Sequence, residues 1–133
     1  AKLRARLPGQ KIMQAVPVGG PETRAGALGM ALAYQDVAEV LLLDTIRKGD
    51  GWFGATGAPH DWVISREIVE SVRIPVILAG GLGPHNVYDA IKAVRPWGVD
   101  SFTHTGTPGD LYRRDPERVR RFIAEANRAA ADL

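Results

Sequence analysis

The stretch that decides the fold is "PVILAGGLGPHNVYDAIKAV", residues 75–94. It starts with an apolar run, breaks at two glycines, and continues with apolar residues at the i, i+3, i+4, i+7 spacing of a helix. These apolar positions are Val87, Ala90, Ile91 and Val94. The pattern predicts a buried strand over residues 75–79, a turn at Gly80–Gly81, and a helix over residues 84–94 with Pro84 at its first position.

The same strand–helix unit recurs along the chain. The predicted strands cover residues 11–18, 39–45, 75–79 and 98–104, and the predicted helices cover residues 21–35, 61–72, 84–94 and 115–130. The first helix carries Ala25, Leu28 and Leu32 on one face, and the last directs Val119, Phe122, Ile123 and Ala126 inward. Asp61 and Asp115 are the expected N-caps. No linker or low-complexity tract interrupts the pattern, so residues 1–133 are predicted to form one α/β domain.

Two architectures fit four strand–helix units joined by right-handed crossovers. One is a small open parallel sheet with helices on both faces. The other is half of a (β/α)8 barrel, because a complete barrel needs about 200 residues or more and the chain has 133. Periodicity alone does not separate the two.

Composition narrows the class of protein. The chain is 45% hydrophobic and 24% charged, as an ordinary globular domain is. It contains neither a run of about 18 apolar residues nor a signal segment, so we expect a cytoplasmic protein without a membrane partner. Cysteine is absent, which excludes disulfides, thiolate metal sites and a cysteine nucleophile or base within this chain.

The charge pattern argues against a nucleic-acid partner. The formal net charge is +2, and many arginines lie in "RRDPERVRRFIAEANR", residues 113–128. Acidic residues are interleaved with them at Asp115, Glu117 and Glu125, which favours a solvated helix face over a basic binding surface.

In either architecture, function gathers where the strands end. Asp44 closes a strongly apolar strand, where it is either an acid with a raised pKa or a cap for nearby backbone N–H groups. Gly80–Gly81 is either an anion site or a turn that needs positive φ. "THTG", residues 103–106, would strengthen the anion interpretation, because neighbouring loops of a barrel's last strands often share one phosphate.

A long glycine-rich loop, residues 47–60, follows the second strand and has the length of a lid or substrate loop. His60 and Asp61 could act there, although Asp61 is equally explained as a cap. The three histidines, His60, His85 and His104, do not have the spacing of metal ligands, so no metal is predicted.

Three segments carry a family resemblance: "LLLDT" (41–45), "GATGAPHDW" (54–62) and "PVILAGGLGPHNVYDAIKAVRPWGVD" (75–100). In order and spacing they resemble the second half of phosphoribosylanthranilate isomerase, a (β/α)8 barrel of tryptophan biosynthesis. "KIMQAVPV" (11–18) matches the family's fifth strand, and the resemblance covers essentially the whole chain.

The resemblance implies an Amadori rearrangement of an aminoaldose phosphate to an aminoketose phosphate, with no cofactor. Asp44 matches the general acid on the sixth strand, and Gly80 and Gly81 match the turn that holds the substrate phosphate through backbone N–H groups. Thr56 and Gly57, with His60 and Asp61, match the loop near the substrate.

The sequence departs from the family pattern in three places. The first four strand–helix units are missing, and with them the strand that carries the base, usually a cysteine. The eighth-strand signature Val-Asp-x-Ser-Ser-Gly-Val-Glu is replaced by "VDSFTHTGTP" (99–108), in which Thr105–Gly106 takes the Ser-Gly place only after a two-residue insertion. Ala55 replaces the second glycine of the loop motif Gly-Gly-Thr-Gly.

We therefore expect strands five to eight of an isomerase-like barrel, with the acid and the phosphate loop but without the base. The expected partners are a phosphorylated small molecule and either the missing first half-barrel or a second copy of the chain. The alternatives are a sugar-phosphate-binding relative without chemistry and a self-associating structural half-barrel.

Overall fold

The computed structural model describes residues 2–46 and 59–133. The helices are α1 (Lys2–Arg6), α2 (Arg24–Tyr34), α3 (Trp62–Ser71), α4 (Val87–Val94) and α5 (Pro116–Ala131), with 3-10 turns η1 (Pro21–Thr23) and η2 (Thr103–Thr105). The strands are β1 (Met13–Val18), β2 (Val40–Thr45), β3 (Val76–Leu78), β4 (Gly98–Val99), β5 (Gly106–Thr107) and β6 (Asp110–Arg114). No helix in these two ranges is both long enough and apolar enough to cross a membrane.

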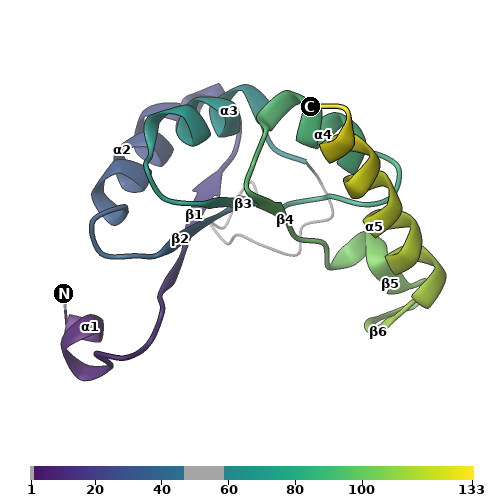
Figure 1. The fold of residues 1–133 in the computed structure, drawn as a ribbon, viewed down its shortest axis with the longest axis horizontal. Coiled ribbons are helices and arrows are strands. Elements are labelled where there is room, and N and C mark those ends of the chain that lie inside the picture. Colours follow the sequence, from purple (N-terminus) through teal and green to yellow (C-terminus); the bar gives the residue numbers. More distant parts are fainter. Residues whose placement is uncertain (1, 47–58) are drawn as a thin grey trace.

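The main sheet has four parallel strands in the order β1-β2-β3-β4, which is also their order in the chain. Figure 1 shows α2, α3 and α4 in a row along one face of this sheet, with α5 beside α4. An open doubly wound sheet would carry helices on both faces. Sequential strands with helices along one face are instead the arrangement found in the wall of a TIM-type barrel.

The core lies between the sheet and this row of helices. Side chains alternate along each strand, and one set in β1–β3 is buried beneath the helices. This set comprises Val16, Val18, Leu41, Leu43, Val76 and Leu78. The predicted stripe of α4 (Val87, Ala90, Ile91 and Val94) is buried against it. Removal of this apolar surface from water is the main favourable contribution to folding.

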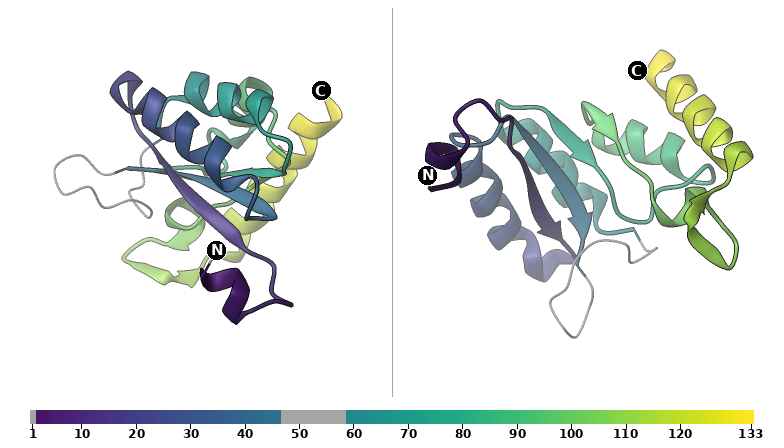
Figure 2. Two further views of the ribbon diagram at one scale, coloured as in Figure 1. Left: turned by 90° about the vertical axis from the view of Figure 1, so that its left-hand side faces the viewer. Right: turned by 90° about the horizontal axis from the view of Figure 1, so that it is seen from below.

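The opposite face of the sheet is open within the described residues. The register aligns Ala15 with Leu42 and Leu42 with Ile77, and all three side chains are only partly buried. Trp97, which precedes β4, is 72% exposed. The right-hand view of Figure 2 looks onto this side of the sheet. Among residues 2–46 and 59–133, the parallel sheet thus has one face covered by helices, one apolar face without a cover, and no further strand beside β1 or β4.

Both predicted N-caps are confirmed. The Asp61 carboxylate accepts a hydrogen bond from the Val63 N–H at 2.9 Å, at the start of α3. The Asp115 carboxylate accepts from the N–H groups of Glu117 and Arg118, at 2.9 and 3.2 Å, at the start of α5. Each aspartate therefore satisfies donors that the first helical turn leaves unpaired.

The predicted strand over residues 98–104 is wrong beyond Val99. The chain turns at Phe102 into η2 and then forms the antiparallel hairpin β5–β6. The Ser101 hydroxyl donates to the Leu82 carbonyl at 2.7 Å, and the Thr105 hydroxyl donates to the Ser101 carbonyl at 3.1 Å. These side-chain bonds to the backbone replace the ladder bonds of a longer strand.

The predicted start of the third helix also needs correction. Helix α4 starts at Val87 and not at Pro84, because the Asn86 side chain accepts from the Gly83 N–H at 2.8 Å and donates to the Gly81 carbonyl at 3.0 Å. These bonds hold the residues before Val87 in a turn.

The buried faces of two helices differ from the predicted ones. In α2 the buried residues are Ala27 and Ala31, whereas Leu32 is 40% exposed. In α5, Ile123 is 52% exposed, although Phe122 is buried as predicted. The inward stripe of each helix is thus rotated from the expected one, because the position of the neighbouring helix and strand decides which residues are covered.

Candidate functional site

Two carboxylates lie at the carboxyl ends of β2 and β4, the strands on either side of β3. The register aligns Leu43 with Leu78 and Leu78 with Val99, so that Asp44 and Asp100 each lie one residue beyond an aligned position. Alternation along the strands turns both away from the helix-covered face. This is the end of a parallel sheet where α/β proteins place their chemistry.

A small cleft joins this pair to the glycine turn. Its lining residues are Asp44, Ala79, Gly80, Gly81, Leu82, Asp100, Ser101, Phe102 and Thr103. The structure therefore brings together three of the predicted site residues, Asp44, Gly80 and Gly81. Sequence reasoning missed the cleft residue Ser101, because it assigned this residue to a strand, and it named Thr103 only as part of the stretch 103–106. The matched Val-Asp pair just before them was the available signal.

Asp44 is half-buried, and this burial raises the pKa of its carboxyl above the ordinary value. Asp100 raises it further by charge repulsion, while the Thr45 N–H, which donates to Asp44 Oδ1 at 2.7 Å, lowers it. A raised pKa keeps the proton on a carboxyl group at higher pH. Asp44 thus has the electrostatic setting of a general acid.

Gly80 and Gly81 both have positive φ, +81° and +63°, which an L-residue adopts only with strain. Gly80 is also packed tightly against two side chains. A Cβ at Gly80 would overlap with Thr45 Oγ1 and would lie 3.0 Å from His60 Nδ1. The lack of a side chain at Gly80 is therefore required by Thr45 and His60 inside the protein, as well as by the turn.

The turn also presents backbone donors. Within residues 2–46 and 59–133, the N–H groups of Gly81 and Leu82 donate to no carbonyl or side-chain oxygen, although Leu82 is only 1% exposed. A buried N–H group without an acceptor costs free energy unless water or a ligand accepts from it. These two groups are suited to an anion.

Thr105 and Gly106 do not line the cleft. Thr105 is 4% exposed, and its hydroxyl donates to the carbonyls of Ser101 and Phe102 at 3.1 and 3.2 Å. The Gly106 N–H donates to the Thr103 carbonyl. The donors that sequence reasoning assigned to phosphate are thus engaged inside the η2 turn.

The long loop is described only at its end. Thr56 and Gly57, predicted to lie near the substrate, are outside the described residues. His60 is 8% exposed and is not a lining residue of the Asp44 cleft. Burial lowers the pKa of His60 to about 4, so its ring is neutral at pH 7. The carboxylate of Asp61 is used as the cap of α3.

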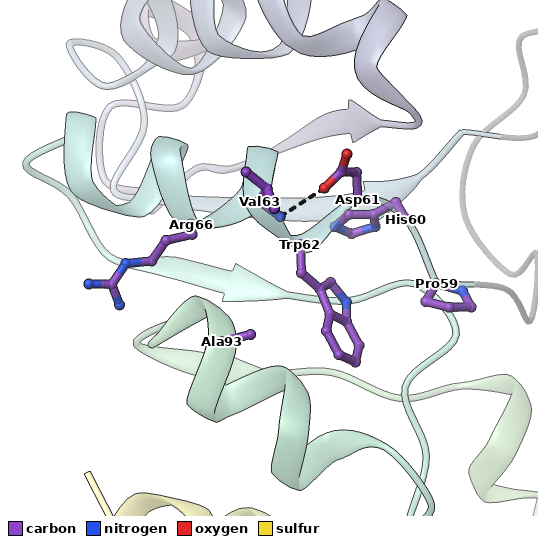
Figure 3. Close-up of a pocket in the computed structure, with 7 residues that line it drawn as sticks. All are labelled: Pro59, His60, Asp61, Trp62, Val63, Arg66 and Ala93. Atoms are coloured by element: carbon purple, nitrogen blue, oxygen red, sulfur yellow. Dashed lines mark hydrogen bonds between the residues drawn. The ribbon is translucent and has the colours of Figure 1, made fainter.

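A larger hollow, about 490 Å³, lies on the helix-covered side and is lined mainly by apolar atoms. Figure 3 shows Trp62 extending from α3 toward Ala93 of α4 in this hollow. The Trp62 Nε1–H is buried and has no hydrogen-bond acceptor among the described residues. Neither Asp44 nor the glycine turn contributes to the hollow, so it is separate from the cleft with the carboxylates.

No group of three or more histidine and carboxylate side chains in the described ranges could hold a metal ion. The chemistry that these residues offer is proton transfer by Asp44 beside a set of backbone donors for an anion. Together with the parallel sheet and its single row of helices, this places the chain in the class of TIM-barrel-like α/β proteins.

Comparison with known proteins narrows the class to a family. The family model described as N-(5'phosphoribosyl)anthranilate (PRA) isomerase matches residues 13–124. The N-(5'-phosphoribosyl)anthranilate isomerase of Methanocella arvoryzae is 41% identical over 92% of this chain and 54% of its own length. Isomerase 2 of Methanosarcina mazei is 43% identical over 93% of this chain and 52% of its own. The chain belongs to the N-(5'-phosphoribosyl)anthranilate isomerase family.

Solved structures of isomerases of this family have the same fold over nearly the whole chain. The Pyrococcus furiosus isomerase superposes with a TM-score of 0.69 at 28% identity, over 96% of this chain and 56% of its own. The Thermotoga maritima isomerase gives a TM-score of 0.70 at 29% identity, over 94% of this chain and 55% of its own. The chain thus spans about half the length of the relatives that it matches.

Proposed function

We propose that this chain is the C-terminal half of a (β/α)8 barrel, strands five to eight, in a protein that isomerises N-(5'-phosphoribosyl)anthranilate in tryptophan biosynthesis. Family membership and the half-length match support the proposal. One solved relative is a complex with reduced 1-(o-carboxyphenylamino)-1-deoxyribulose 5-phosphate, an analogue of the aminoketose phosphate. The observation that carries the proposal is the raised pKa of Asp44 at the end of β2.

Asp44 is the general acid in this proposal. It donates its proton to the furanose ring oxygen as the bond between C1 and that oxygen breaks, leaving an iminium ion. A base then removes the proton from C2, which gives an enolamine, and tautomerisation yields the aminoketose. Partial burial and the neighbouring Asp100 keep the Asp44 proton in place before the reaction.

The glycine turn is the phosphate end of the proposed site. The N–H groups of Gly81 and Leu82 point to backbone recognition of the phosphate, with Gly80 setting the turn. Thr103, which lines the same cleft, replaces Thr105–Gly106 as the donor from the adjoining loop, since the Ser101 hydroxyl is engaged by the Leu82 carbonyl.

The base lies outside this chain in our proposal, because the family carries it on the first strand and the present sequence contains no cysteine. The first half of the barrel would pair with the free edges of β1 and β4 and cover the apolar face around Leu42 and Ile77. The 133 residues by themselves would then have negligible isomerase activity, since an acid without a base leaves the C2 proton in place.

A turnover assay tests the proposal with the protein at its natural length. Conversion of phosphoribosylanthranilate changes its fluorescence, and Asp44→Asn should abolish the conversion. Asp36→Asn is the matched control, because Asp36 forms an exposed ion pair with Arg73 far from the cleft. Absence of turnover by the unmodified natural-length protein would refute the isomerase proposal.

One observation favours a second candidate, a sugar-phosphate-binding relative without chemistry. The segment after β4 differs from the family signature and folds into η2 and a hairpin. This candidate predicts saturable binding of ribose 5-phosphate, lost in Gly81→Asp, together with no turnover. A self-associating half-barrel would instead give a dimer of the chain in sedimentation, and a monomer would contradict it.

A further inference from the structure

His60 is the centre of a buried polar cluster that the proposed mechanism does not use. Its Nδ1 atom lies 3.1 Å from Thr45 Oγ1, and its Nε2 atom lies 2.7 Å from Ser65 Oγ. The exposed fractions of the three residues are 8% for His60, 6% for Thr45 and 0% for Ser65. Buried polar side chains with matched partners act as rigid connections between the elements that carry them.

Each ring nitrogen of His60 faces one hydroxyl group, Nδ1 that of Thr45 and Nε2 that of Ser65. A hydroxyl group can donate or accept, so a neutral imidazole pairs both of its nitrogens here. The low pKa of His60, caused by burial, agrees with a neutral ring that has one donor and one acceptor.

The backbone directly after His60 is anchored. The Asp61 N–H donates to the Gly19 carbonyl at 3.1 Å, just after β1, and the Asp61 side chain caps α3. Figure 3 shows His60 and Asp61 together at the N-terminal end of α3. The imidazole is therefore held from the β1 end and from α3, and neither anchor depends on the cleft.

The ring contacts the two parts of the cleft through Thr45 and Gly80. The Thr45 N–H donates to the Asp44 carboxylate, and the Thr45 hydroxyl is hydrogen-bonded to His60 Nδ1. A Cβ at Gly80 would lie 2.9 Å from Thr45 N and 3.0 Å from His60 Nδ1. A shift of the imidazole would thus move Thr45, which orients the Asp44 carboxyl, and would change the packing against Gly80.

We propose that His60 is a positioning residue: by holding Thr45 against Gly80, its neutral imidazole sets the placement of the Asp44 carboxyl relative to the phosphate-binding turn. His60 does not touch substrate in this proposal. The proposal rests on the function proposed above for its effect on turnover, but the geometry that it describes is measurable without turnover.

Two amide variants separate the two ring nitrogens. In His60→Asn the side-chain amide reaches the place of Nδ1 and bonds Thr45, whereas in His60→Gln the side-chain amide reaches the place of Nε2 and bonds Ser65. Ile68→Val is the matched control, since Ile68 is 0% exposed on α3 and the change removes one buried methylene group without touching the polar cluster. The control shows what loss of stability alone does to the cleft.

The first measurement is the backbone amide spectrum of the natural-length protein, with titration of ribose 5-phosphate. We expect His60→Gln to shift the Asp44, Gly80 and Gly81 resonances and to weaken binding about tenfold, with His60→Asn and Ile68→Val close to the unmodified protein. Equal effects of the two amide variants, or none, would overturn the positioning role. This outcome does not depend on isomerase activity, so it is distinguishable from failure of the proposed function.

The second measurement is steady-state turnover. Since a misplacement of about 1 Å can cost about 100-fold in rate, we expect His60→Gln to lower kcat by about 10- to 100-fold and His60→Asn to stay within about threefold. If His60 transferred a proton itself, both amides would lose activity alike, which would refute the proposal. Retention of kcat in His60→Gln would refute it as well.

Discussion

Gly80→Ala adds a methyl group at the tightest contact of the candidate site. The backbone there has φ +81°, and the new Cβ would overlap with Thr45 Oγ1 and meet Thr45 N at 2.9 Å. The left-handed conformation costs an L-residue about 1–2 kcal/mol. Overpacking adds about 1–3 kcal/mol, because the Thr45 main chain lies in the paired strand β2 and has little room to move. We therefore expect a loss of about 2–5 kcal/mol in the free energy of unfolding.

Two other glycines separate the two contributions. Gly109 has φ +84°, and a Cβ added there would meet no atom within 4 Å, so Gly109→Ala should cost only the backbone part, about 1–2 kcal/mol. Gly29 lies in α2 with equally open surroundings, and Gly29→Ala should stabilise the helix by about 0.5–1 kcal/mol.

Urea unfolding of the natural-length protein measures all three changes, and the midpoints compare directly if the urea dependence of the unfolding free energy stays the same. We expect Gly80→Ala to be the most destabilising of the three by at least about 1 kcal/mol. A Gly80→Ala variant no less stable than Gly109→Ala would refute the packing argument, because backbone strain alone would then explain both.

Three further outcomes follow from the site and the helix caps. The pKa of His60 falls from 6.5 to about 4 on folding, because burial disfavours the charged ring. About 3 kcal/mol of the free energy of unfolding, present above pH 6.5, should therefore be lost as the pH drops to 4. In urea titrations, His60→Gln should flatten this pH dependence. Asp44→Asn should lower turnover at least about 100-fold. Turnover of the unmodified protein should fall as the pH rises through the raised pKa of Asp44, and a flat pH profile would contradict the acid role. Asp115→Ala should destabilise α5 by about 1 kcal/mol in thermal unfolding, with Asp115→Asn close to the unmodified protein, and equal losses in both would argue against capping.

The parts of the fold that depend on near neighbours could be predicted from the sequence. The apolar stripe of α4 and the caps Asp61 and Asp115 involve residues within a turn or two of one another, so their pattern is visible in the chain. The position of Asp44 at the end of an apolar strand was visible for the same reason.

The segment after β4 could not be predicted in this way. Val99 lies in β4 as predicted, but the Ser101 hydroxyl donates to the carbonyl of Leu82, which lies in the loop between β3 and α4. A hydroxyl near a strand gives no sign in the sequence of which distant carbonyl it will reach. The eighth-strand prediction therefore failed where a side chain, and not the main chain, makes the bond to the preceding strand–helix unit.

The sequence by itself determined four strand–helix units, the place of Asp44, and a Gly-Gly turn between a strand and a helix, because each rests on local spacing. The tertiary structure decided why Gly80 must lack a side chain: Thr45 and His60, distant in sequence, pack against it. It also decided that Asp100 lies near enough to Asp44 to raise its pKa, since strand register and burial arise only when the sheet assembles. Gly80, the first of the two glycines that suggested a phosphate site, thus also packs against Thr45 and a buried histidine.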